Sequence, residues 1–136
     1  MPISGPVKSE YFRKTASTAI NVGDVLESAS GAVNPADSSD LNLYGVSAQK
    51  IASTDTDYAD NTRIMCWIMN PDIEWLADVG TGTATTANEG IKYDLTDADS
   101  IDLNATTHGV FTVTRFVSAT QVIGRFNASY QFRPAV

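Results

Sequence analysis

The sequence is poor in the residues on which most catalytic and metal sites depend. Among 136 residues there are one cysteine, Cys66, and one histidine, His108. A single cysteine allows neither an internal disulfide nor a cysteine-based zinc site. His108 precedes Gly109 in an expected turn and no Gly-x-Ser-x-Gly motif accompanies it, while Cys66 lies in the most apolar run, where a thiol is usually buried and inert. We therefore expect no enzyme, no cofactor and no tightly bound metal.

Long apolar runs and an excess of positive charge are missing as well. No apolar stretch approaches the ~20 residues that a membrane helix needs, and residues 1–6 lack the basic and apolar regions of a signal peptide. The net charge of −7 argues against nucleic acid as a partner, because phosphate-binding surfaces are basic. We expect a chain made in a cytoplasm, without a membrane or nucleic-acid partner.

The charges that are present are unevenly distributed. Up to Lys14 there are three basic residues and one acid, and after Thr114 there are three arginines and no acid. The residues between hold fifteen acids and three basic residues. Basic ends on an acidic body indicate either that the ends face an acidic partner or that they pair with the body itself.

Short runs rich in Val, Ile, Phe, Tyr and Thr, bounded by turn residues, dominate the chain and are typical of strands. No stretch keeps the apolar spacing of a helix. We expect strands within residues 23–27, 31–34, 43–50, 63–69, 73–77, 90–95, 101–103, 110–116 and 121–126, followed by an alternating tail at 129–136. The pattern predicts an all-β fold, a small single-domain β-barrel or β-sandwich over residues 15–136 with an extended N-terminal arm at residues 1–14.

Two stretches give the sharpest structural predictions. Residues 63–69 are apolar on both faces, which is typical of a strand covered on two sides. The core residues expected of this strand are Ile64, Cys66 and Ile68 on one face and Met65 and Trp67 on the other. Residues 110–116 and 121–126 predict a hairpin joined by the three residues 118–120.

Two acidic segments superficially resemble calcium loops. They contain Asp55, Asp57 and Asp60 in one case and Asp94, Asp97, Asp99 and Asp102 in the other. Both lack the glycine and the glutamate that an EF-hand loop requires at positions six and twelve. Solvated turns in which aspartate bonds its own backbone are the commoner interpretation. Residues 80–83, Gly-Thr-Gly-Thr, likewise lack the third glycine and the lysine of a phosphate loop.

The two tryptophans suggest an alternative function. We expect Trp67 in the core, whereas Trp75 lies on an alternating strand and is the one candidate for an exposed aromatic platform. With the Thr/Gly-rich loop at residues 80–88, Trp75 would make a carbohydrate-binding β-sandwich the alternative to a structural protein.

The N-terminal segment, residues 1–14, combines basic and aromatic side chains. In residues 7–14 both faces of an extended chain are mixed, which suits an arm better than a core strand. Such an arm can add a strand to a partner and bury its aromatic side chains there. The residues that we expect to contact the partner are Lys8, Tyr11, Phe12, Arg13 and Lys14.

Several short motifs resemble those of small head decoration (capsid cement) proteins of tailed bacteriophages. They are Ile20-Asn21-Val22-Gly23-Asp24-Val25, then Tyr44-Gly45-Val46-Ser47-Ala48, and later residues 90–95 followed by the hairpin at 110–126. The resemblance implies a β-rich fold, homotrimers at local three-fold positions on the outside of the virion, and an arm that grips the major capsid protein. It implies a structural protein that decorates and stabilises the capsid by binding across neighbouring subunits. Another phage component, of a tail or fibre, is an alternative.

Overall fold

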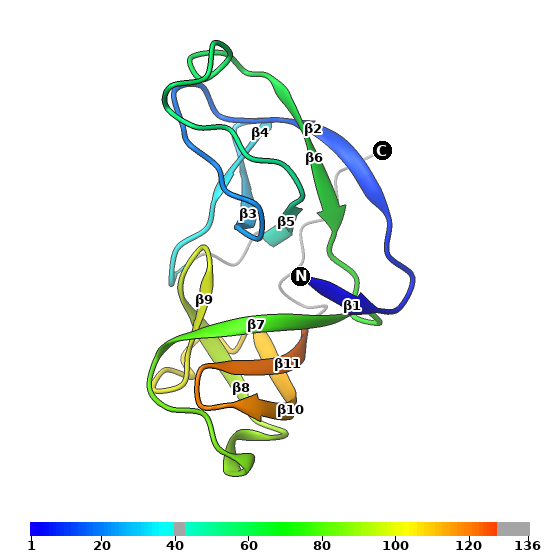
Figure 1. The fold of residues 1–136 in the computed structure, drawn as a ribbon, viewed down its shortest axis with the longest axis vertical. Helices are drawn as coiled ribbons and strands as arrows, with labels where there is room; N and C mark the ends of the chain where they lie inside the picture. Colours follow the sequence, from blue (N-terminus) through cyan, green and yellow to red (C-terminus); the bar gives the residue numbers. More distant parts are fainter. Residues whose placement is uncertain (40–42, 128–136) are drawn as a thin grey trace.

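Eleven β-strands and one short 3₁₀ helix form the part of the chain that the structure, a computed structural model, describes, residues 1–39 and 43–127. The strands belong to two sheets, which occupy the lower and upper halves of the molecule in Figure 1. The predicted all-β class is confirmed. The strands follow the runs of β-branched and aromatic residues, which fit a pleated, half-buried surface.

The first sheet has the order β1-β7-β11-β10-β8-β9. Its strands are β1 (Pro2–Ser4), β7 (Glu74–Thr81), β8 (Lys92–Asp97), β9 (Ser100–Asp102), β10 (Phe111–Ser118) and β11 (Gln121–Phe126). Strand β9 also pairs in parallel with the second half of β7. Strands β7, β11, β10, β8 and β9 therefore form a closed ring, and β1 lies beside the first half of β7.

The second sheet has the order β2-β6-β5-β3-β4. Its strands are β2 (Ser9–Arg13), β3 (Val25–Ala29), β4 (Ala32–Pro35), β5 (Leu43–Ser47) and β6 (Arg63–Ile68). The two outer strands approach each other at one end, where Lys14 forms a parallel bridge with Val33 and the Thr15 N–H donates to the Val33 carbonyl at 2.9 Å. This sheet is thus closed at one end of β2 and open along the rest.

Two clusters of buried side chains hold the sheets together. The main core lies between the sheets and joins Trp75, Phe111 and Phe126 of the first sheet to Val25 and Val46 of the second. Its aromatic rings meet edge to face, with centroids 5.6 Å apart for Trp75 and Phe126 and 5.1 Å apart for Phe111 and Phe126. The second cluster lies on the other face of the second sheet and contains Ile20, Val33, Tyr44, Leu26, Ile51, Ile64 and Cys66.

Strand β6 is covered on both faces, as its sequence predicts. Ile64 and Cys66 are fully buried in the second cluster, against which Ile68 also packs, whereas Trp67 packs against the main core from the other face. Met65 is half-buried. The strand runs between β2 and β5, so it is internal to its sheet.

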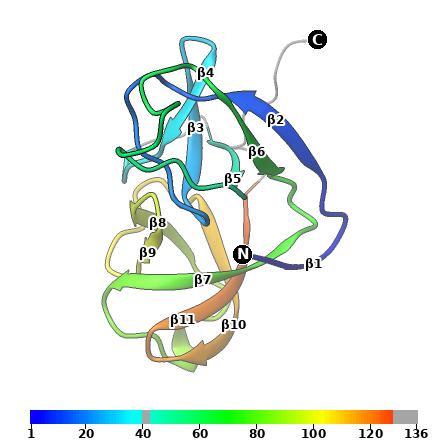
Figure 2. The same cartoon turned by 45° about the horizontal axis from the view of Figure 1, so that its top comes forward.

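The N-terminal segment is extended, but it is paired with the rest of the protein rather than standing clear of it. Strand β1 pairs with β7 in the first sheet and β2 pairs with β6 in the second, so the segment passes from one sheet to the other (Figures 1 and 2). Gly5 makes the connection at φ 102°, and a Cβ there would lie 2.5 Å from the Asp72 carbonyl oxygen. A side chain is therefore sterically incompatible with this crossing.

Three further details complete the comparison with the sequence. The predicted hairpin is confirmed as β10–β11, but Ser118 pairs with Gln121, which leaves a two-residue loop instead of three. A 3₁₀ helix, Thr86–Asn88, interrupts the loop after β7 and begins with a capping box. The tail predicted at 129–136 lies outside the described residues. No helix in the described ranges is long and apolar enough to cross a membrane.

Candidate functional site

Strand β2 has one edge that pairs with no other strand along most of its length. The Lys8 carbonyl accepts from the Ile68 N–H, and the Lys14 N–H donates to the Thr62 carbonyl, both at 2.9 Å. In an antiparallel ladder the hydrogen-bonding residues alternate, so the even-numbered residues of β2 face β6. The backbone N–H and C=O groups of Ser9, Tyr11 and Arg13 therefore point away from the sheet.

The second sheet does not cover this edge beyond its closed end. Thr15 is bonded to Val33 of β4, but β4 begins at Ala32, just after the turn at Ser30 and Gly31, so β2 runs on past the end of β4. The bridge of Lys14 with Val33 brings the Arg13 carbonyl against β4, whereas no strand pairs with the outward edge at Ser9 and Tyr11 in the described part of the chain. An uncovered strand edge of this kind is a template for adding a further strand.

Side chains on the outer face of β2 differ from those on its inner face. Tyr11 and Arg13 are exposed and lie opposite Met65 and Arg63 of β6. On the inner face Phe12 is half-buried and its ring lies 4.1 Å, edge to face, from that of Tyr44. Burial, reinforced by the neighbouring Glu10 carboxylate, raises the pKa of Tyr44.

A groove of about 190 Å³ lies beside the open edge. Phe12 and Arg13 of β2 line one side, the β3–β4 hairpin with Ser28 and Val33 lines the other, and Tyr44 also contributes. The groove therefore combines an aromatic and aliphatic lining with the edge of β2, which pairs with no other strand at Ser9 and Tyr11 among the described residues.

The five predicted partner-binding residues differ in their exposure to solvent. Lys8, Tyr11 and Arg13 are exposed, Phe12 is half-buried, and Lys14 is fully buried. The Lys14 ammonium donates to the Tyr58 carbonyl at 2.7 Å and to the Thr15 carbonyl at 3.1 Å. Lys14 is therefore an internal structural residue in this conformation. It lies on the same face of the strand as Phe12, and this face points inward at the closed end of the sheet.

Exposed large hydrophobic side chains are concentrated in the N-terminal segment. Of seven such residues in the described ranges, four are Met1, Ile3, Val7 and Tyr11. A scattered apolar residue on a surface needs no explanation, but a concentration of them marks an interaction site. Within the described residues, more of these side chains lie in the N-terminal segment than in any other stretch of similar length.

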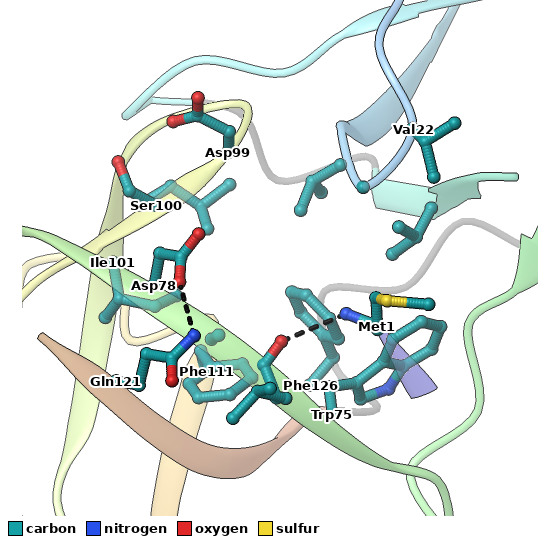
Figure 3. Close-up of a pocket in the computed structure, with 16 residues that line it drawn as sticks. Met1, Val22, Trp75, Asp78, Asp99, Ser100, Ile101, Phe111, Gln121 and Phe126 are labelled. Carbon is teal, nitrogen blue, oxygen red and sulfur yellow. Dashed lines mark hydrogen bonds between the residues drawn. The ribbon is translucent and has the colours of Figure 1, made fainter. Parts of the chain in front are cut away.

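A second hollow, of about 260 Å³, lies between the two sheets (Figure 3). Its walls include the rings of Trp75, Phe111 and Phe126. Its polar lining is formed by Asp78, Asp99, Ser100 and Gln121 and by the Met1 amino group, which donates to the Leu76 carbonyl at 3.0 Å. Burial lowers the pKa of this amino group. Among these polar groups the Gln121 amide donates to Asp78 and the Ser100 hydroxyl donates to Asp97, at 3.1 and 3.0 Å.

His108 is held by a carboxylate but faces no nucleophile. Its Nδ1 atom lies 3.3 Å from Asp94 Oδ2, and Asp94 Oδ1 also accepts from the N–H groups of His108 and Gly109, each at 2.7 Å. No hydroxyl or thiol is bonded to the imidazole in the described part of the protein. Asp94 therefore organises the turn before β10, which is a structural task.

Cys66 is fully buried, as expected from its apolar strand. Burial raises the pKa of its thiol to about 12, so the thiolate is absent at neutral pH. The predicted burial of this thiol is confirmed.

Three aspartates of the acidic loops accept hydrogen bonds from backbone N–H groups two or three residues away. Asp55 accepts from the Ala52 N–H at 2.7 Å, Asp97 from the Asp99 N–H at 3.1 Å and Asp102 from the Asn104 N–H at 2.8 Å. Within residues 1–39 and 43–127 no three His, Cys, Asp or Glu residues are grouped so that they could hold a metal ion. The turn interpretation accounts for Asp55, Asp97 and Asp102.

The prediction of an exposed Trp75 is wrong. Trp75 is only 2% exposed and packs against Phe126, whereas Trp67 is the partly buried tryptophan. Trp75 alternates in phase with Ile73, which is also buried, and an apolar face of an alternating strand normally faces the core. The shared face of Ile73 and Trp75 was therefore the feature of the sequence from which the burial of Trp75 could have been predicted. A carbohydrate platform at Trp75 is thereby removed.

Comparison of the chain with protein-family models, with curated protein sequences and with solved structures found no match in any of the three. The open edge of β2 and its groove therefore stand as the candidate site on their own geometry.

Proposed function

We propose that this protein is a structural component of a virion that decorates the outside of a tailed-bacteriophage capsid and stabilises it. In this proposal it is a homotrimer that binds across neighbouring copies of the major capsid protein, and its partner is a protein surface rather than a small-molecule substrate. The observation that carries the proposal is the N-terminal segment, which joins an open strand edge to the largest concentration of exposed apolar side chains in the described residues.

A strand edge with exposed apolar neighbours suits attachment to a large assembly. Adding a strand along β2 would satisfy the outward backbone groups of Ser9 and Tyr11, and would cover the Tyr11 ring. Because β1 and β2 belong to different sheets, a load on the N-terminal segment would be shared by both halves of the protein. The sequence motifs around Gly23 and Gly45 that resemble decoration proteins support the same assignment.

Co-sedimentation with undecorated heads tests the proposal. The heads are assembled from the major capsid protein encoded in the same genome, and the bound fraction is measured over a range of protein concentrations. We expect saturable binding of the wild-type protein and a higher temperature of head disruption at saturation. Absence of binding at all concentrations, with the protein folded, would refute the decoration function.

A proline at position 11 tests the mode of attachment. The Tyr11 N–H points away from β6, so Tyr11→Pro removes no hydrogen bond within the sheet but blocks strand addition. The matched control, Tyr11→Ala, removes the same ring and keeps the N–H. We expect Tyr11→Pro to bind about tenfold more weakly than Tyr11→Ala, the effect of losing one or two backbone hydrogen bonds. Equal binding of the two variants would show that the protein attaches without strand addition.

A further inference from the structure

Two arginines lie directly opposite each other on neighbouring strands beside the open edge. Arg13 of β2 is paired in register with Arg63 of β6, and both side chains are exposed. Odd-numbered residues of β2 occupy the positions that exchange no hydrogen bonds, where facing side chains approach most closely. Like charges placed directly across a pair of strands destabilise it.

No carboxylate offsets this repulsion in the described part of the chain. Neither Arg13 nor Arg63 forms a salt bridge there, whereas Arg115 and Arg125 both lie within 4 Å of Glu74, at 3.9 and 3.4 Å. The protein has a net charge of −7 and abundant carboxylates. Two arginines in register, neither with a salt bridge in the described residues, are therefore suited to bind an anion from a partner.

The surroundings of the two arginines favour an anion that is carried by an extended peptide segment. Arg13 lies between the open stretch of β2 at Ser9 and Tyr11 and the closed end at Lys14, and it lines the groove between β2 and the β3–β4 hairpin. A strand added beside β2 would continue the pleat, so that its side chains alternate between the groove and the outer face on which Arg13 and Arg63 lie. A carboxylate at the outer position next to Arg13 would come within reach of both long side chains.

We propose that the edge of β2 binds an extended acidic segment of a partner protein, whose carboxylate is held by Arg13 and Arg63. This rests on the proposed function in that the partner is the major capsid protein. Charge complementarity selects this occupant: residues 128–136 of the chain itself carry Arg133 and no acid, so they match the arginine pair poorly.

Single charge-neutralising variants test the arginine pair on the heads. We expect Arg13→Gln and Arg63→Gln each to weaken binding about tenfold, as for loss of a charge-assisted hydrogen bond, and to reduce its salt dependence. Lys50→Gln, which neutralises another exposed cation on the loop before β6, is the matched control and should change binding less than twofold. Thermal unfolding of both arginine variants should be unchanged or shifted upward, because the repulsion is relieved. If both arginine variants bind the heads as tightly as the wild type does, the inference is overturned and the decoration function still stands.

A peptide assay tests the site without the heads. The probes are capped six-residue peptides of alternating Glu and Val, Gln and Val, or Lys and Val, titrated into isotope-labelled protein and followed by NMR. We expect the Glu peptide alone to shift the amide signals of residues 9–13 and the side-chain N–H signals of Arg13 and Arg63. Equal shifts with the Gln peptide, or shifts located elsewhere, would overturn the inference even where the heads bind.

The same protein samples test two other possible occupants of the β2 edge, a second copy of the chain and residues 128–136. If the wild-type protein self-associates in sedimentation and Arg13→Gln abolishes this, a second copy occupies the edge and the inference is overturned. If a chain ending at Asn127 binds the Glu peptide tenfold more tightly than the full chain, residues 128–136 occupy the edge, with the same consequence. Unchanged sedimentation and unchanged peptide affinity support a segment of another protein.

Discussion

Replacing the two tryptophans separately measures which of them belongs to the core. Trp75 is 2% exposed and contacts Phe126 edge to face, whereas Trp67 is only partly buried. Truncation of a fully buried aromatic residue to alanine costs about 3–5 kcal/mol of unfolding free energy. The indole of Trp75 borders the hollow of about 260 Å³, so it lacks packing partners on one side, and we expect Trp75→Ala to cost about 3–4 kcal/mol.

Trp67→Ala should cost less because part of its ring is already in contact with water. Scaling the same range by its partial burial gives about 1.5–2.5 kcal/mol. The Trp75 Nε1–H is buried without a hydrogen-bond partner, so Trp75→Phe loses volume but no hydrogen bond. We expect that variant to cost about 1–2 kcal/mol.

Urea denaturation followed by fluorescence of the remaining tryptophan and by circular dichroism provides the measurement. Each alanine variant retains one tryptophan, and coincident transitions in the two signals would justify a two-state analysis. A larger loss for Trp67→Ala than for Trp75→Ala would refute the placement of Trp75 between the sheets. So would an unchanged denaturation midpoint for Trp75→Ala.

Three further changes test other parts of the structure. Gly124→Ala should prevent the β10–β11 hairpin from pairing normally, because a Cβ there would lie 2.2 Å from the Thr112 carbonyl oxygen; native-like chemical shifts for β10 would contradict this. The Cys66 thiol, with a pKa of about 12, should react with a disulfide reagent at pH 8 only after denaturant is added, and rapid labelling of the folded protein would show that the strand opens. Burial raises the pKa of Asp24, so its ionisation opposes folding: the stability associated with its neutral form is present at low pH and is lost as pH rises through the folded pKa. Asp24→Asn should therefore be at least as stable as wild type at pH 7, with the difference vanishing near pH 3, and a variant that is less stable at pH 7 would show that the charge itself is needed.

Much of the fold was predictable because strand formation depends on local pattern. Runs of β-branched and aromatic residues located the strands, and the apolar character of both faces predicted that β6 is covered on two sides. The β10–β11 hairpin was predictable from two such runs with a short connection. Its loop was one residue shorter than predicted because Ser118 still pairs with Gln121.

The candidate site was only partly predictable. The sequence drew attention to residues 1–14 through their basic and aromatic side chains, and Tyr11 and Arg13 are indeed exposed. It gave no indication that Arg13 faces Arg63, because these residues are fifty positions apart and meet only through the register of β2 with β6. It also gave no indication that Lys14 is internal, since the bridge from Lys14 to Val33 is a long-range contact.

The sequence by itself determined that this protein is built of short strands, since side-chain alternation and turn residues act within a few positions of the chain. The tertiary structure alone decided which strands are neighbours and in which register, because pairing joins residues that are far apart in the chain. For that reason the segment that resembles a free arm forms the outer strands of both sheets, and the open edge of β2 became the candidate site.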